Sequence, residues 1–317
     1  DGIQFWFYTS AQALWEAYQA QKIDGLSRVP LEYLATALAD ESLTFHSAPL
    51  SGQAMVLLNL DSRLFQDPVV RQALLCATDR QALIAETLGG QGVAAHGPIP
   101  PFSWAYDPAL REYAYDPKRA AVLLSHAGWR IPEEGIARRK GGWPFSFDLL
   151  TDDAPQHIAL AEMLSNQWAQ VAVTAIPVAV TPSELVRRLQ ARDFEAAIYE
   201  WSRLPADPDL YALWHSTQIA PEGQNVAGLR DAWIDLALEE GRLQLDPAVR
   251  KRVYDRFQQR FAEILPALPL YHPVRNYAIS QRVHGVQIGP LFDPSDRFRT
   301  IRQWYMATKR MPENAIR

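Results

Sequence analysis

The stretch of residues 145–201 alternates between strand-like and helix-like patterns, and this order limits the possible folds more than any other feature of the chain. Three apolar, β-rich runs are separated by two helical patterns, and the second helix opens with the capping box Thr181-Pro182-Ser183-Glu184. A β-α-β-α-β order predicts strands that lie side by side and are joined by right-handed crossovers. We therefore expect an α/β fold with flanking helices. The three predicted strands are residues 145–150, 173–180 and 194–201.

Helix caps and apolar runs predict the remaining elements. Asp67 is a good N-cap and Pro68 fits the first helical position, so we expect one helix that continues to Gly89 and Gly90. Three charged residues would then lie on that single helix as helix-surface and lobe-packing charges, not as ligand contacts: Arg71, Asp79 and Arg80. Further strands are expected at residues 3–8, 54–60, 268–272 and 276–280. Further helices are expected at residues 11–21, 31–39, 117–128, 158–171, 231–240 and 247–264.

Composition and spacing argue against several function classes. The chain has 317 residues and a net charge of −5, and its Lys and Arg residues are scattered, so we expect no nucleic-acid partner. No apolar run approaches the roughly 20 residues that span a bilayer. The seven histidines lack the spacing of a metal site, Cys76 is a lone thiol, and no nucleophile–base motif is visible. We therefore expect no metal, no cofactor and no enzymatic activity.

Three segments, in their order and spacing, resemble the solute-binding proteins of family 5 of ABC importers, which include peptide-, nickel- and oligopeptide-binding types. The first is a strand that ends in Asn59, followed by Val70-Arg71-Gln72-Ala73 and Asp79-Arg80. The second is Tyr115-Asp116-Pro117 and the helix that follows it. The third contains spaced acidic, arginine and tyrosine positions: Asp235, Asp246, Arg250 and residues 266–271. Each motif alone is weak, but together they extend over nearly the whole chain.

The resemblance implies a two-lobed protein of the periplasmic-binding-protein-like type II class, whose lobes contain a mixed sheet and flanking helices. The chain opens at Asp1 without Met, in what reads as a strand, and we interpret it as a fragment without its signal peptide. Residues 1–56 and 268–317 would belong to an incomplete first lobe, and residues 57–267 would be the complete second, ligand-closing lobe. Hinges that let such lobes close are expected near residues 58–59 and 269–272.

The segment after the third predicted strand is the most informative one for ligand binding. It runs from Tyr199 to Asp209, and ligands bind by preference at the carboxyl ends of strands. The resemblance implies that Trp201 matches a tryptophan lining the solute cavity, although a core tryptophan would give the same pattern. Arg203 beside this aromatic wall suits a carboxylate, a phosphate or a sugar hydroxyl, and its alternative role is that of a surface arginine.

Four further residues belong to the predicted ligand site. Peptide-binding members of the family carry an aspartate three residues after the tryptophan, which pairs with the α-ammonium of the ligand. Here that position is Leu204, a departure that argues against free-amine peptides unless Asp207 or Glu200 supplies the charge. Asp207 is at least as compatible with an ordinary turn. Trp104 ends a Pro-rich loop and either faces the cleft or packs on its own lobe.

Two functions from different classes fit these observations. The first is an extracytoplasmic solute-binding component of an ABC importer, periplasmic or on the cell surface, which captures a small polar solute between two lobes. The solute would be peptide-like, an opine, a sugar or a metal chelate, the partner a membrane permease, and the protein a monomer. The alternative is the solute-sensing domain of a transcription regulator whose N-terminal DNA-binding domain is missing here. A hydrolase is a weaker third option, because no catalytic set is visible.

Overall fold

The computed structural model describes residues 2–133, 135–205, 207–289, 291 and 293–307. Its contacts divide the chain into unit 1, which contains Asp1–Leu50 and Val274–Arg317, and unit 2, which contains Ser51–Pro273. The chain thus passes between the units twice, at Leu50–Ser51 and at Pro273–Val274. Both passages lie close to the lobe boundaries expected from the sequence. That the units correspond to the lobes of a two-lobed protein stays a prediction.

Unit 2 contains a mixed sheet, as expected. The strands β7, β8 and β9 are parallel, with β7 between the other two, so the alternating segment does place its strands side by side. Next to β9 come β3 and then the first part of β10, each antiparallel to its neighbour, and β4 also pairs with β10. The bounds are β3 (Gln53–Leu58), β4 (Gly92–Ala94), β7 (Ser146–Asp152), β8 (Thr174–Val180), β9 (Ala196–Trp201) and β10 (Ala267–Ser280).

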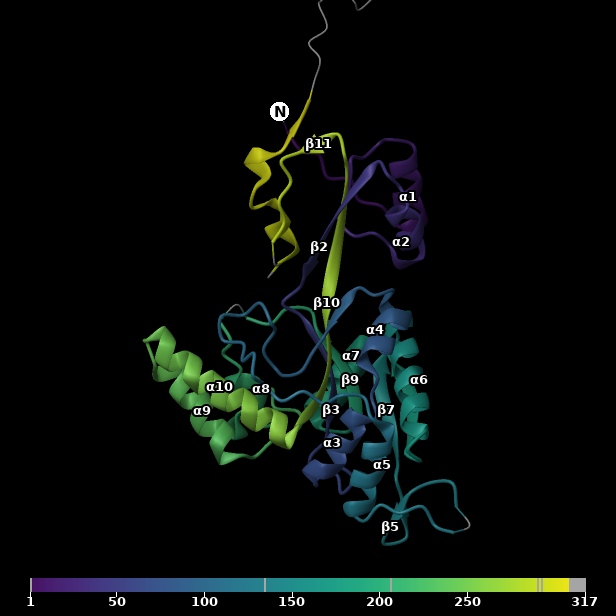
Figure 1. The fold of residues 1–317 in the computed structure, drawn as a ribbon, viewed down its shortest axis with the longest axis vertical. Helices are drawn as coiled ribbons and strands as arrows, with labels where there is room; N and C mark the ends of the chain where they lie inside the picture. The colour runs from purple at the N-terminus through teal and green to yellow at the C-terminus, as the bar shows by residue number, and fades with distance from the viewer. Residues whose placement is uncertain (1, 134, 206, 290, 292, 308–317) are drawn as a thin grey trace, which may run out of the picture. The chain divides into compact units, whose positions relative to one another are not determined.

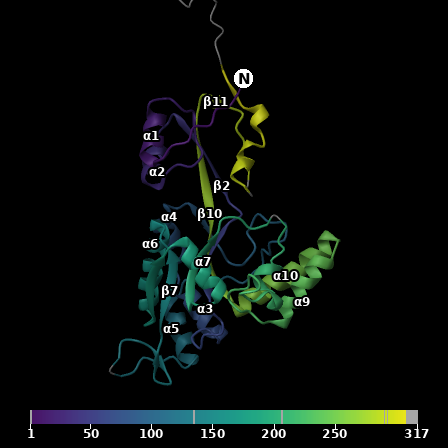
Figure 2. The ribbon, with the colours of Figure 1, turned by 180° about the vertical axis from the view of Figure 1, so that it is seen from behind.

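Helices cover both faces of this sheet (Figure 1; seen from behind in Figure 2). The first core holds residues of α3 (Pro68–Cys76), α4 (Arg80–Leu88), α5 (Pro117–His126) and α6 (Pro155–Ala169). The second core holds residues of α7 (Pro182–Ala191), α8 (Tyr211–Trp214), α9 (Ala232–Leu243) and α10 (Pro247–Ile264). Successive strand residues point to opposite faces: in β7, Leu149 lies in the first core and Leu150 in the second.

The helix expected after Asp67 is two helices, and the prediction of one continuous helix was wrong. The first, α3, ends at Cys76, and the second, α4, begins after Asp79, whose side chain accepts a hydrogen bond from the backbone N–H of Ala82. The prediction that Arg71 and Arg80 lie at the helix surface was also wrong, although a role in packing within the lobe is not contradicted. Both are buried, and their guanidinium groups donate to backbone carbonyls, which supply the partners that buried N–H groups require.

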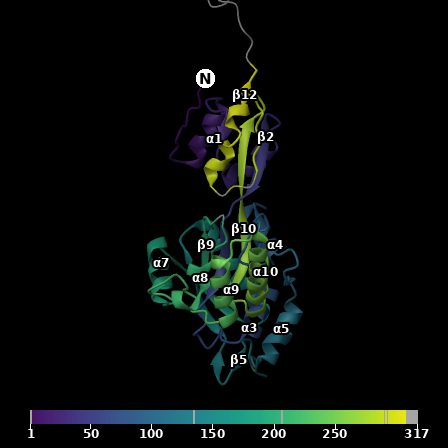
Figure 3. The same cartoon turned by 90° about the vertical axis from the view of Figure 1, so that its left-hand side faces the viewer.

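Unit 1 is built around the second part of β10, which pairs with β1 (Gly25–Leu26) and β2 (Leu43–Pro49). Its core joins these strands to α1 (Ala11–Gln19) and α2 (Leu31–Leu38), and Figure 3 shows α1 beside β2 and β10. Trp15 and Tyr33 stack in this core at 5.2 Å between ring centroids. A small ladder of β11 (Val283–His284) and β12 (Tyr305–Met306) completes the unit, with two 3-10 turns, η2 (Pro294–Phe298) and η3 (Ile301–Gln303).

Two strand predictions need correction. Residues 3–8 were expected to form a strand, but the described residues 2–8 contain none, and Trp6 and Phe7 are exposed. A strand needs a ladder partner, and no described strand pairs with this segment. The two strands expected at residues 268–272 and 276–280 are one strand, β10, which continues through Pro273 with a shift of register between Pro269 and Tyr271.

The remaining short elements are the hairpin of β5 (Arg139–Lys140) and β6 (Trp143–Pro144) and the 3-10 turn η1 (Ser216–Gln218). Within the described part of the chain, no helix is both long enough and apolar enough to cross a lipid bilayer.

A buried histidine in unit 2 is expected to make the stability of the fold sensitive to acid. His272 is 1% exposed, its Nδ1 lies 3.0 Å from the carbonyl oxygen of Gly52, and burial lowers its pKa to about 4 from an ordinary value of 6.5. In the unfolded chain this histidine therefore binds a proton below about pH 6.5, whereas in the folded chain it does so only below about pH 4. As the pH falls from 6.5 to about 4, we expect His272 to lower the free energy of unfolding by about 3 kcal/mol.

Urea unfolding at pH 7.5 and pH 4.5 measures this effect, with His272→Asn as the comparison because an amide can still donate to the Gly52 carbonyl. The acid-induced loss of stability should be smaller in the variant than in the wild-type protein. An equal loss in both proteins would show that His272 does not carry the effect.

Candidate functional site

The carboxyl ends of the parallel strands meet at one edge of the unit 2 sheet. Strand β7 ends at Asp152, and β9 ends at Trp201, which lies opposite Gln53 at the start of the antiparallel strand β3. The segment predicted to bind ligand follows Trp201 directly. In open α/β sheets, crevices outside this edge are the usual place for ligands. The surroundings of this carboxyl edge are therefore the candidate site.

Trp201 is partly buried and packs on the second core. Its ring meets that of Tyr199 edge to face, with 5.0 Å between centroids. The backbone on its other side is held closely by Gly52, where a Cβ atom would lie 2.6 Å from the carbonyl oxygen of Trp201 and 2.9 Å from that of Ser202. Only glycine fits this close approach. The indole is thus fixed in place without being sealed in the interior, and its contact with a solute stays a prediction.

Glu200 points to the opposite face of the sheet. Its carboxylate lies on the side of the first core, where the hydroxyl of Tyr271 donates a hydrogen bond of 3.0 Å to Oε2. The same oxygen lies 3.6 Å from Nε2 of His157 in the first turn of α6. His157 in turn lies 2.7 Å from Asp152 through Nδ1. The structure therefore places Glu200 and Trp201 at one edge but on different faces of the sheet. This follows because successive side chains of a strand point to opposite faces.

These contacts shift the protonation of two neighbours of Glu200. Burial alone would lower the pKa of His157, but the carboxylates of Glu200 and Asp152 outweigh it and raise this pKa above its ordinary value. Burial, reinforced by the charge of Glu200, raises the pKa of the Tyr271 hydroxyl and keeps it a donor. The sequence interpretation missed Asp152, His157 and Tyr271. The position of Asp152 at the end of a predicted strand was the available signal.

Several buried polar atoms at this edge have no hydrogen-bond partner among the described residues. They are Oγ1 of Thr151, Oε1 of Gln53 and Nε2 of His157, which has only the longer ion-pair contact with Glu200 at 3.6 Å. Gln53 uses its amide nitrogen for a 2.7 Å bond to the carbonyl of Gly97, so its oxygen alone is left over. Buried polar atoms without a hydrogen bond are rare in folded proteins, and here they lie near the ends of β7 and β9. The edge is thus polar and incompletely satisfied.

The turn that follows Trp201 is anchored rather than free. Leu204 is buried, and its N–H donates to the carbonyl of Ser51 at 3.2 Å. Asp207 accepts two hydrogen bonds from Arg250 of α10, and Asp209 accepts three from Arg242 of α9. Arg203 is exposed on the same turn. The carboxylate of Asp207 is thus engaged within the protein, and direct solute contacts by these residues stay predictions.

Trp104 and the turn after Trp201 both contact Arg250. Its side chain is 44% exposed, and its ring meets Tyr254 of α10 edge to face at 5.8 Å between centroids. The guanidinium of Arg250 lies 5.4 Å from the Trp104 ring centroid. The structure therefore brings Trp104 and Asp207 together around Arg250, although they come from distant parts of the sequence.

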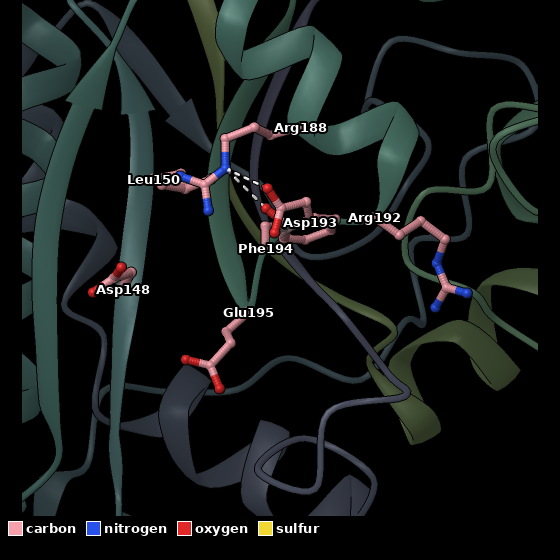
Figure 4. A pocket seen from close by; sticks show the side chains of 7 residues that line it. All are labelled: Asp148, Leu150, Arg188, Arg192, Asp193, Phe194 and Glu195. Atoms are coloured by element: carbon pink, nitrogen blue, oxygen red, sulfur yellow. Dashed lines mark hydrogen bonds and ion pairs between the residues drawn. The ribbon is translucent and has the colours of Figure 1, made fainter.

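A separate pocket of about 260 Å³ opens in unit 2 (Figure 4). It lies at the opposite, amino-terminal end of β9 and contains none of the predicted site residues. In Figure 4 Arg188 reaches toward Asp193, its ion-pair partner at 3.3 Å, whereas Arg192 points away from the other labelled side chains. Burial, followed by the charge of Asp148, raises the pKa of Glu195. The full lining is Asp148, Leu150, Arg188, Arg192, Asp193, Phe194 and Glu195.

Comparison with known proteins gives a family and several relatives. Residues 1–221 match the family described as bacterial extracellular solute-binding proteins, family 5 Middle. The chain is 30% identical over 254 residues to oligopeptide-binding protein AppA of Bacillus subtilis, covering 78% of this chain and 46% of that protein. It is 28% identical over 242 residues to heme-binding protein A of Haemophilus influenzae, covering 75% of this chain and 42% of that protein.

A solved structure supports the same relationship. The oligopeptide-binding protein AppA from Bacillus subtilis, in complex with a nonapeptide, matches with a TM-score of 0.77 at 27% identity, over 94% of this chain and 59% of that chain. The predicted fold class is thereby confirmed. The chain spans about half the length of the curated relatives it matches. With a match over residues 1–221 that agrees with the motifs and with the fold, this chain belongs to family 5 of the bacterial extracellular solute-binding proteins.

Proposed function

We propose that this chain is part of the solute-binding component of an ABC importer, which captures a small polar solute between its two lobes. The carboxyl edge of unit 2 carries this proposal, because it combines a fixed tryptophan with a polar, partly unsatisfied surface in a chain of a solute-binding family. Such a protein needs no catalytic set, since ligand-dependent closure is the only event required of it. We infer that it is not an enzyme.

The arrangement of acidic residues supports a role for Glu200 in the site. Leu204, at the position where peptide-binding members carry an aspartate, is buried and apolar. The carboxylate of Asp207 is held by Arg250. Glu200 is anchored through Oε2, while its Oε1 has no partner among the described residues, and its side chain is 25% exposed. We infer that Trp201 and Arg203 contact the solute, that Glu200 supplies negative charge, and that Trp104 borders the site.

We further propose that the complete protein is a monomer, works outside the cytoplasm in the periplasm or at the cell surface, and delivers its solute to a membrane permease. The relatives described above are named as binding proteins for oligopeptide and heme, which favours this reading over a transcription regulator. The coding sequence upstream of Asp1 distinguishes the two. A signal peptide there supports the importer, and a helix-turn-helix domain supports the regulator.

A thermal-shift screen of the complete protein tests the proposed function directly. The panel contains peptides of two to nine residues, haem, a nickel–histidine chelate, opines and sugars. A solute present at 100 times its Kd should stabilise the protein by about 2.7 kcal/mol, which corresponds to a rise of several degrees in Tm. If no compound in any class gives a saturable shift, the proposed function is wrong for these solutes.

A further inference from the structure

Arg250 belongs to one of the sequence motifs, yet the proposed function gives it no role. It lies in the first turns of α10, after the cap residue Asp246, and its side chain is 20% exposed. Arginines at such positions usually form one weak surface ion pair. Arg250 instead contacts three other segments of unit 2 as well as Tyr254 on its own helix, and this set of contacts is what a further role has to explain.

Its hydrogen bonds reach two of these segments and Tyr254. Nη1 donates to Asp207 at 2.8 Å and Nη2 to the same carboxylate at 2.5 Å, which makes the pair bidentate. Nε donates at 2.7 Å to the carbonyl of Gly241 in α9. Nη2 also donates at 3.1 Å to the hydroxyl of Tyr254, one turn further along α10. A bidentate pair fixes orientation as well as distance, because both planar groups must align.

The third segment is the loop that carries Trp104. The guanidinium lies 5.4 Å from the ring centroid of Trp104 and 5.4 Å from that of Tyr254, within the range of a cation–π interaction. Trp104 and Asp207 stand about a hundred residues apart in the sequence, and each lies on a segment predicted to border the solute. Arg250 therefore contacts both borders of the proposed site at the same time.

We propose that Arg250 is a positioning residue of the solute site, which holds the Trp104 loop and the turn after Trp201 in fixed register with each other. This inference rests on the proposed function. Arg250 acts through Asp207 and Trp104 and does not itself contact the solute. By ordering both segments before the solute arrives, it lowers the conformational entropy that binding would otherwise cost.

The contacts require a guanidinium and not just a positive charge. A lysine at this position could approach Asp207, but its ammonium group could not maintain the planar, two-pronged pairing together with the bond to Gly241. Arg250→Lys should therefore behave more like Arg250→Met than like the wild-type protein. A purely electrostatic role would give the opposite order.

The chain offers a matched control on the same turn. Arg242 of α9 forms a bidentate ion pair with Asp209, only two residues from Asp207, and its guanidinium lies 3.8 Å from the ring centroid of Tyr211. It has the same chemistry as Arg250: one carboxylate and an aromatic ring. No contact joins it to Trp104 within the described residues. Arg242→Met thus loosens the turn without touching the Trp104 loop.

Hydrogen exchange in the complete protein without solute tests whether Arg250 orders the two segments. The probes are backbone amides with partners in the structure: Tyr106 and Asp107 in the first segment, Leu204 and Tyr211 in the second. Arg250→Met should speed exchange about tenfold in both segments, whereas Arg242→Met should do so only in the second. Wild-type exchange rates in the Trp104 loop of Arg250→Met would overturn the proposal, whatever happens to solute binding.

Affinity measurements with a synthetic nonapeptide and with haem then test the consequence for binding. For a probe that binds the wild-type protein, we expect Arg250→Met and Arg250→Lys to weaken the Kd about tenfold, and Arg242→Met less than threefold. Equal losses in the variants of Arg250 and Arg242 would overturn the proposed role. Wild-type protein that binds neither probe counts against the proposed function for these solutes, while the exchange experiment still decides whether Arg250 joins the two segments.

Discussion

Replacing Trp201 by alanine in the complete protein is expected to weaken solute binding about 100-fold, the largest effect of any single change at the candidate site. Buried aromatic anchors at interfaces typically contribute 2–4 kcal/mol, and about 1.4 kcal/mol corresponds to a tenfold change in Kd. The ring of Trp201 contacts Tyr199 and its backbone lies close to Gly52, so we expect it to present a preformed apolar wall to the solute. Isothermal titration with whichever screened solute binds measures the loss.

Trp143 provides the matched control for this substitution. It is an exposed tryptophan in the β5–β6 hairpin, before the amino-terminal end of β7, and its ring lies 3.7 Å from the guanidinium carbon of Arg63. Trp143→Ala should change the Kd less than twofold. If Trp201→Ala binds solute as well as Trp143→Ala does, the tryptophan at the end of β9 is not part of the solute site.

The substitution Arg71→Met should lower the free energy of unfolding by about 4 kcal/mol, the largest expected effect on stability. Burial lowers the pKa of Arg71 to about 10, so its guanidinium is still charged at neutral pH. It donates to four backbone carbonyls near the end of α10 and in the segment before α3: Ile264, Leu265, Phe65 and Gln66. Methionine fills similar space but leaves these buried acceptors without donors. Urea unfolding followed by tryptophan fluorescence measures the difference.

The neighbouring residue Gln72 serves as the control, because its Nε2 donates to the carbonyl of Glu263 at 2.7 Å. That bond also joins α3 to the end of α10, but it lies at the surface, where water can replace the donor. Gln72→Met should therefore cost less than about 1 kcal/mol. Similar losses for the two substitutions would contradict the view that Arg71 acts as a buried cap of α10.

Local chemistry in the sequence was enough to predict most of the elements of unit 2. The cap at Thr181 and the Asp-Pro caps at Asp67, Asp116 and Asp246 each mark a true helix start, because a side-chain acceptor is required there whatever the tertiary contacts. The alternation of strands and helices likewise predicted parallel neighbours. Pattern alone could not show that Asp79 starts a second helix, since a capping aspartate and a surface aspartate look alike.

The candidate site was predictable only as a segment. The position after a strand pointed to Trp201 and the residues that follow it. Partners from distant parts of the chain, however, decide what each side chain can do. The sequence gives no indication that Asp207 meets Arg250 or that Glu200 meets Tyr271 and His157, because those contacts depend on the tertiary fold. The burial of Arg71 and Arg80 was missed for the same reason: charged residues on a helix ordinarily face water.

The order of strands in unit 2 has a consequence for biosynthesis. Strand β3 is the first strand of unit 2 to be translated and is buried along its whole length, yet both of its ladder neighbours, β9 and β10, are translated after most of the unit. During that interval a largely apolar strand has two open edges, a state prone to pairing with other chains. We expect slow, late sheet closure and a requirement for the nascent polypeptide to be shielded until the end of β10 has emerged.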